Sequence, residues 1–312
     1  MLRKMTWCAA AVIMIALAIN GCSSSSKMAL QMQAGQTVSY ESTTTMVKDY
    51  KFEQPTMKKV DENQTSTATM IRFDQKVAEV GADGMAIVDV VVKGIQCKVV
   101  SKNATRYDFD SADAAKQSDS MNNLIGQGYR ISISSTGQVK VLDAAAIRAV
   151  AVTGEGQSLA KNLLSDENIV KRHQLPLPEG AKALSVKQSW TKVVPSPAGL
   201  LAPKTFEKVY TVAEVGKDKV VVNMAAKESL SKKAEGQSSS GTMGMFSKMF
   251  DSQDAYTGSL VFNPADGSVM VCEEKLVSTY TASEMPQNAP ADALPDTLMM
   301  RLTNGVSLKK IQ

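Results

Sequence analysis

The sequence predicts a mainly β (α+β) fold in which two repeated, curved antiparallel β-meanders flank a helical segment. Most of the chain alternates apolar and polar side chains, which is the pattern of half-buried strands. Two stretches recur: VAEVGADGM from Val77 resembles VAEVGKDKV from Val212, and ISISSTGQVKV resembles LVFNPADGSVMV. Both echoes come in the same order, at offsets of 135 and 130 residues, so a repeated meander explains them better than chance.

Residues 1–21 have the layout of a secretory signal peptide. Arg3 and Lys4 form a short basic region, and the apolar run Trp7–Ile19 is shorter than the ~20 residues that a bilayer span needs. The run ends in Ile-Asn-Gly before Cys22, a cut site that resembles the lipobox of bacterial lipoproteins. The resemblance implies cleavage before Cys22 and a lipid on its sulfur, so that the protein would contact a membrane through this N-terminal lipid.

Residues 22–35 are expected to form a flexible tether, because Cys22 is followed by four serines. No Asp follows Cys22. Resemblance to the proteobacterial sorting rule then implies an anchor in the outer membrane on its periplasmic side, with the inner membrane as the alternative.

The charge of the mature chain argues against nucleic acid as a partner. The formal charge is +4, and loss of Arg3 and Lys4 with the signal leaves +2, since residues 1–21 contain no acid. No block of Lys and Arg follows that would bind a phosphate backbone.

The first meander is predicted over residues 36–142. Gln36–Val47 and Thr65–Val80 alternate, with a loop at Asp49–Asn63 between them. Met85–Val100 is rich in Val and Ile, with Gly94 as a bulge or bend. Gly128–Ser134 follows, and Val139 and Val141 continue after a turn.

The connector, residues 143–180, is predicted to be helical. Asp143–Val152 and Gln157–His173 space apolar residues near 3.6 positions, which indicates one or two helices. Pro176 and Pro178 then end them.

The second meander is predicted over residues 181–312. Its strands are expected within Val186–Val194, Phe206–Val215, Val220–Met224, Tyr256–Phe262 and Val269–Tyr280. The tail Thr297–Ile311 contains Asn304-Gly305, which indicates either a hairpin turn or a helix C-cap followed by a strand.

The loop 231–255 carries a Met/Phe-rich stripe. It is expected to be a lid that packs on the sheet over a ligand, or an exposed patch that contacts lipid or a partner protein. The stripe consists of Met243, Met245, Phe246, Met249 and Phe250.

Besides Cys8 of the signal peptide and Cys22, the predicted lipidation site, the sequence contains two further cysteines. Cys97 and Cys272 either form one disulfide, which the cell envelope permits, or stay two separate buried thiols.

No catalytic, metal or cofactor site is indicated. His173, the one histidine, follows a predicted helix and is read as a surface residue or one placed by the helix dipole. Ser158 and Lys161 match an SxxK pattern without the other elements of penicillin-binding enzymes. Asp108, Asp110 and Asp113 lack the glycine and glutamate of an EF-hand loop. A non-enzymatic protein is therefore expected.

Several segments together resemble an uncharacterised family of bacterial lipoproteins, known as a domain of unknown function. They are the lipobox, LQMQAGQTVSYEST, IGQGYRISISSTGQVKVLD and LPLPEGAKALSVKQSW. Two curved meanders on such a protein resemble the half-barrels of lipoprotein carriers and chaperones. The resemblance implies a binding or structural role in the cell envelope, with an envelope protein as a possible class of partner. The alternative is a carrier that holds an acyl chain or other apolar ligand in the concave sheet, and a hydrolase is the least favoured reading.

Overall fold

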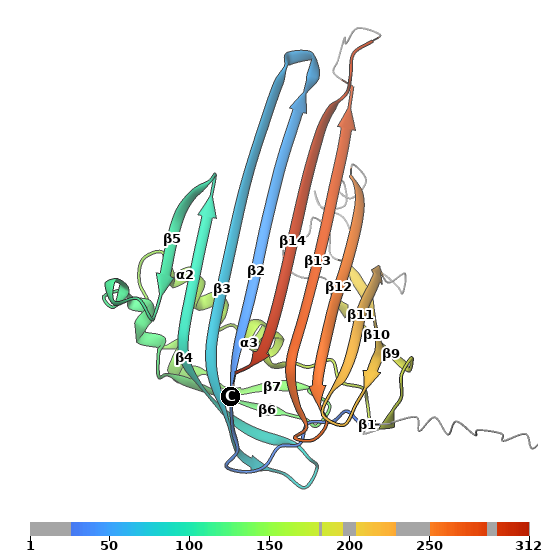
Figure 1. The fold of residues 1–312 in the computed structure, drawn as a ribbon. Coiled ribbons are helices and arrows are strands. Elements are labelled where there is room, and N and C mark those ends of the chain that lie inside the picture. Colours follow the sequence, from blue (N-terminus) through green and yellow to red (C-terminus); the bar gives the residue numbers. More distant parts are fainter. Residues whose placement is uncertain (1–25, 181–182, 196–203, 229–249, 286–291, 312) are drawn as a thin grey trace, which may run out of the picture.

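The computed structural model describes residues 26–180, 183–195, 204–228, 250–285 and 292–311. It confirms the predicted mainly β fold with a curved antiparallel sheet. The sheet is open and has 12 strands, and the long antiparallel strands run side by side along a common axis (Figure 1). None of the described helices is long and apolar enough to span a bilayer.

The two halves of the chain form one sheet. Along it the strand order is β7-β6-β4-β3-β2-β14-β13-β12-β11-β10-β9, with β5 added beside β4. The first half supplies β2 (Thr37–Gln54), β3 (Lys59–Val80), β4 (Ala86–Ser101), β5 (Ala104–Asp110), β6 (Gly128–Ile133) and β7 (Val139–Asp143). The second half supplies β9 (Ser189–Pro195), β10 (Thr205–Val215), β11 (Val220–Glu228), β12 (Asp251–Asn263), β13 (Ser268–Glu284) and β14 (Asp296–Lys310).

The repeated sequences form equivalent turns. Val77 lies at the end of β3 and Val212 near the end of β10, and each strand has a β-bulge directly after this valine. The second echo forms the β6–β7 and β12–β13 turns, with Gly137 and Gly267 at positive φ. The segment before β2 ties these two turns together, because the Leu30 amide donates to Ser135 O (2.8 Å) and the Gln31 amide to Gly267 O (3.1 Å).

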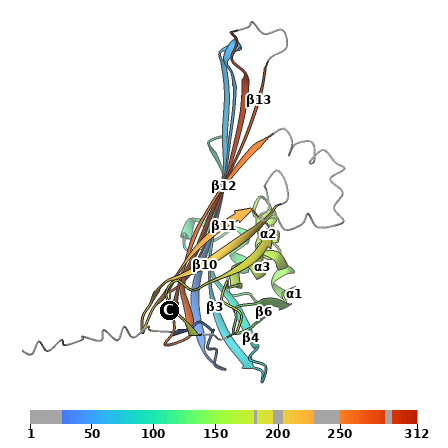
Figure 2. The same cartoon turned by 90° about the vertical axis from the view of Figure 1, so that its right-hand side faces the viewer.

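The helical connector is confirmed as three short helices on one face of the sheet, beside its lower part (Figure 2). They are α1 (Ala145–Arg148), α2 (Gly156–Leu163) and α3 (Asp166–His173). Their apolar sides cover the main core, where Phe73, Ile131, Ile147, Ile169 and Leu177 are almost fully buried. Three short 3-10 helices lie at Pro55–Met57, Ala114–Lys116 and Ser120–Leu124. A separate two-stranded sheet pairs β1 (Ser26–Lys27) with β8 (Ala183–Leu184).

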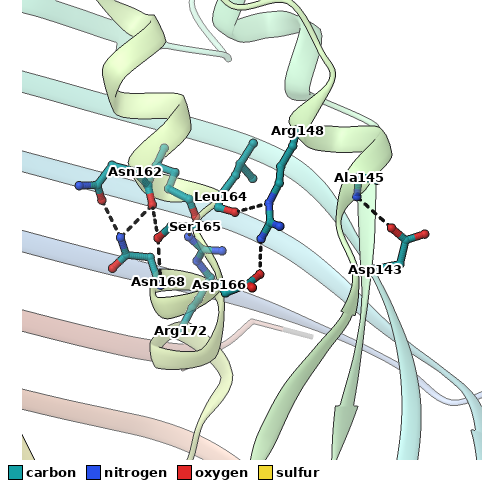
Figure 3. Close-up of polar contacts among 10 residues, drawn as sticks. Asp143, Ala145, Arg148, Asn162, Leu164, Ser165, Asp166, Asn168 and Arg172 are labelled. Carbon is teal, nitrogen blue, oxygen red and sulfur yellow. Dashed lines mark hydrogen bonds and ion pairs between the residues drawn. The ribbon is translucent and has the colours of Figure 1, made fainter.

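Polar contacts fix the helices to one another (Figure 3). Ser165 caps α3 by accepting from the Asn168 amide, which satisfies one of the free N–H groups at the helix start. Arg148 donates to Leu164 O (2.8 Å) and pairs with Asp166, so α1 is joined to the start of α3. The connector therefore presents its apolar side to the sheet in a fixed orientation.

Two predictions about strand boundaries were wrong. The expected loop Asp49–Asn63 is mostly strand: β2 and β3 pair up to Gln54 and Lys59, and the turn is confined to Pro55–Lys58. The tail is neither a hairpin nor a helix, because Asn304 and Gly305 lie inside β14, which is hydrogen-bonded to β13 on one side and β2 on the other. Hydrogen bonds to the neighbouring strands satisfy the backbone N–H and C=O groups of these residues, which the local sequence pattern had assigned to turns.

Candidate ligand-binding face

The helix-bearing face continues above the helices, where no described helix lies over it (Figure 2). Tyr40 of β2 and Leu308 of β14 belong to the main core, so their side chains lie on the helix-bearing face. Because successive side chains of a strand point to opposite faces, every second residue upward from these two lies on the same face. In this upper part most side chains are apolar or aromatic and half-buried, although the exposed Lys48 lies between Met46 and Tyr50 on the same face of β2. We call the following residues the upper surface: Met46, Tyr50, Phe52, Leu298 and Met300.

The opposite face of the same strands is mostly polar. In β14, the two neighbours of Met300, which are Met299 and Arg301, lie on this opposite face. In β2, Lys51 and Glu53 lie on the same opposite face and form an ion pair at 2.6 Å. One face thus has the composition of a solvated sheet, whereas the upper surface has the composition of a binding face.

Beside the upper surface lies a buried cluster that is separate from the main core. Its apolar members are Phe206, Leu276, Tyr280 and Leu302, each no more than 5% exposed. Ser278 is fully buried among them and donates to Asp254 Oδ1 at 2.6 Å.

Lysines from β10 and the residue before it reach into this cluster. Lys204 Nζ lies 2.9 Å from Asp254 Oδ2. Although burial opposes it, the hydrogen bond and charge of Asp254 hold the pKa of Lys204 above its ordinary value. Lys208 pairs with Glu274 of β13 and stands over the Tyr256 ring, 4.8 Å from its centroid.

The Lys208–Glu274 pair demonstrates the curvature of the sheet. Two strands, β11 and β12, lie between β10 and β13, yet the two side chains meet across them. Gly258 of β12 gives them room, since a Cβ there would lie 2.7 Å from a backbone oxygen of β13 and 3.1 Å from Met224 Sδ. The helix-bearing face is therefore concave at this end.

These charged residues do not stand out in the sequence. Their partners are 50 residues apart for Lys204 and Asp254 and 66 for Lys208 and Glu274, so no local motif links them. One signal was present: Lys208 alternates with Phe206, Tyr210 and Val212, at a position where the pattern expects an inward apolar side chain.

The reading of His173 as a surface residue was wrong, although it does end α3. His173 is 2% exposed. Its Nδ1 lies 2.7 Å from Gln75 Nε2 and its Nε2 lies 2.6 Å from the Tyr129 hydroxyl, which also accepts from Arg172 Nη1 at 3.1 Å. Burial, and then the charge of Arg172, hold the pKa of His173 well below its usual range. Tertiary packing of α3 on the sheet thus turns the helix end inward.

A small cavity of about 50 Å³ adjoins this histidine. Gln36, Tyr40, Gln75 and Leu175 contribute to its wall together with His173. A space of that size holds water-sized molecules, not an acyl chain.

The disulfide that the sequence left open does not form. Cys97 lies on β4 and Cys272 on β13, with β3, β2 and β14 between them, and both are free thiols. Strands are spaced ~4.8 Å apart, so the two Cα atoms are far beyond the reach of an S–S bond. Burial raises the pKa of Cys97 to about 11 and that of Cys272 to about 12.

Other predicted site residues lie apart from the candidate face or outside the described residues. Ser158 and Lys161 are exposed on α2. Asp108 and Asp110 lie in β5, and Asp113 follows that strand. Within the described ranges, no group of three or more potential metal ligands occurs. Phe250 is half-buried just before β12, whereas Cys22, Met243, Met245, Phe246 and Met249 lie outside the described residues.

No protein-family model and no curated protein sequence matches the chain. Among solved structures, one of lipovitellin that concerns lipid–protein interactions aligns with 90% of this chain at 12% identity and a TM-score of 0.46. This chain spans 26% of that lipovitellin chain. The outer membrane protein OprG of Pseudomonas aeruginosa (8% identity, TM-score 0.17, covering 90% of this chain and 100% of its own) is also similar, as is OpdL of the same organism (7%, 0.19, 89% and 99%). Scores this low do not establish a shared fold, so function has to be argued from the face itself.

Proposed function

We propose that this protein is a lipid-anchored envelope protein that binds an apolar ligand on the helix-bearing face of its sheet. The upper surface is the observation that carries the proposal: a row of Met, Tyr, Phe and Leu side chains above the described helices, on a face that is concave beside it. A sheet face of this composition needs a cover, and an apolar ligand such as an acyl chain supplies one.

The proposed anchor is Cys22, lipidated after signal cleavage, in the outer membrane with the domain on the periplasmic side. The ordering of the basic region, apolar run and cysteine in the sequence supports this. Metabolic labelling with palmitate tests it, since label in the wild type that is lost in Cys22→Ser is the expected result. Label retained by Cys22→Ser contradicts the anchor, and the distribution between separated inner and outer membranes tests the location.

The proposed role is binding and not catalysis. His173, the one histidine of the sequence, has both ring nitrogens engaged in the core and no access to a substrate. The lysines of the buried cluster contact carboxylates of their own. These engagements leave the upper surface as the feature best suited to contact a ligand.

Native mass spectrometry tests the ligand. Residues 23–312 are secreted behind a signal peptide that is cleaved without lipidation, their mass is measured under native conditions, and bound lipid is extracted with organic solvent. We expect reproducible adducts of lipid mass, reduced in Met300→Ser and retained in Met299→Ser, its neighbour on the polar face. Equal loss in both variants, or an apo mass with no extractable lipid, refutes the proposal and favours a structural role.

A further inference from the structure

Among the residues that the structure describes, three buried polar atoms on the helix-bearing face have no hydrogen-bond partner. They are Asn63 Oδ1, Lys192 Nζ and Asn304 Nδ2. Register places all of them on the side of the upper surface: Asn63 faces Tyr50 across β2 and β3, Asn304 faces Met46, and Lys192 faces Lys208. Buried polar groups without a partner are rare in native proteins, and each one is a position where a bound water or ion can complete the hydrogen bonding.

An unpaired buried ammonium group such as Lys192 Nζ costs more free energy than an unpaired buried amide atom of Asn63 or Asn304. Lys192 lies on β9, directly opposite Lys208 of β10, so two ammonium groups are cross-strand neighbours on one face. One carboxylate, Glu274, contacts Lys208, whereas no carboxylate of the described part of the chain lies within ion-pairing distance of Lys192. Burial lowers the pKa of Lys192, while the charge of the exposed Glu179 acts in the opposite direction from a greater distance. A buried cation without a partner is destabilising unless an anion joins it.

The side chains between Lys192 and Asn304 are suited to an apolar chain. The face carries, from β9 to β14, Lys192, Lys208, Ala226, Tyr256, Leu276 and Asn304. Ala226 leaves space beside the lysines, and Tyr256 and Leu276 continue the row toward the upper surface. A ligand across this row would meet the two lysines at one end, apolar side chains at Ala226, Tyr256 and Leu276, and the amide of Asn304 at the other end.

From this arrangement we infer that the ligand is an amphiphile with an anionic head group, a carboxylate or a phosphate, and that Lys192 is its charge-recognition residue. The inference rests on the proposed function, because the apolar chain must bind the upper surface. An anionic head group at Lys192 Nζ forms the charge-assisted hydrogen bond that the protein itself does not supply. It also separates the like charges of Lys192 and Lys208.

A fatty acid and a fatty alcohol of equal length carry the same apolar chain, so a difference between their affinities reports on the head group alone. The secreted soluble protein, residues 23–312, is loaded with 11-(dansylamino)undecanoate, and displacement is measured with palmitate and with 1-hexadecanol. We expect palmitate to bind about tenfold to a hundredfold more tightly than the alcohol. Lys192→Met should abolish that preference and leave the affinity for hexadecanol nearly unchanged. A phosphate monoester of hexadecanol shows whether phosphate is preferred to carboxylate.

Lys275→Met is the matched control, since Lys275 lies exposed on the other face of β13 and should leave the preference intact. If palmitate and hexadecanol bind equally, or if Lys192→Met and Lys275→Met behave alike, the head-group inference is wrong while the proposed function stands. If neither compound nor the dansyl probe binds, both the inference and the proposed function fail.

Discussion

His173 should make the protein sensitive to mild acid in a way that one substitution removes. The imidazole is buried between Gln75, Tyr129 and the Phe73 ring, whose centroid lies 4.7 Å away, and the Arg172 guanidinium beside it is permanently charged. With the Gln75 amide as found, its Nε2 donates to Nδ1. A protonated ring would place a second N–H against that donor. Geometry, burial and charge therefore all favour the neutral form in the folded protein.

The sign of the effect follows from the lowered pKa. The unfolded chain takes up a proton near the ordinary value of 6.5, whereas the folded chain does not until a much lower pH. Stability is thus fully present above that value and is lost as pH falls, by about 1.4 kcal/mol per pH unit, until the folded pKa is reached. At pH 5 the loss from this group is at most about 2 kcal/mol.

Urea unfolding between pH 8 and pH 5 measures this loss in the wild type and in His173→Gln. Trp190 is a convenient probe, because it is the only tryptophan after the signal peptide, it stacks on Tyr210 at 5.3 Å and its Nε1 donates to Pro176 O. Carboxylates contribute to both curves, so the difference in slope isolates His173. Parallel curves for the two proteins would show that the histidine is not neutral in the fold or not buried, and would refute the reasoning.

Three further predictions test the concave end and the cysteines. Gly258→Val should lower the free energy of unfolding by about 1–3 kcal/mol, because the added atoms meet the backbone of β13; an unchanged urea midpoint would contradict the close approach. Glu274→Gln should destabilise by about 2 kcal/mol and Glu274→Gln with Lys208→Met by less, since the double change removes the unpaired charge; additive losses in that cycle would mean that the two side chains do not interact. The thiols of Cys97 and Cys272 should react with Ellman's reagent at neutral pH only after unfolding, and rapid reaction of the folded protein would contradict their burial and raised pKa values.

Local patterns predicted much of the fold. Alternation around Ile131 and Tyr210 indicated strands, the spacing of Leu159 and Leu163 indicated a helix, and the two VAEVG stretches indicated equivalent turns. In each case the period of the side chains follows directly from the backbone geometry. The prediction failed where both faces of a strand are polar, as in Asp61–Asn63, since such a stretch has no apolar period to detect.

Long-range pairing was not predictable from the sequence alone. Asn304-Gly305 has the composition of a turn, and only the strands on both sides keep it extended. The same holds for the candidate face: Tyr50 and Met300 become neighbours through the β2–β14 ladder, and Lys192 meets Lys208 through β9 and β10. The apolar members were visible as residues, but their assembly on one surface depends on the register of strands far apart in the chain.

The β2–β14 ladder also sets a constraint on how the protein folds. Tyr40 pairs with Lys310 and Glu53 with Thr297, so the centre of the sheet closes only when the last strand has been delivered. Until then, the early strands β2–β4 expose one unpaired edge and the later strands β10–β13 another, each able to pair with a foreign strand. Contacts of such high sequence separation make folding slow. A chain that crosses a membrane N-terminus first would hold these edges open through most of its export, and protection from aggregation at that stage would matter as much as the stability of the finished sheet.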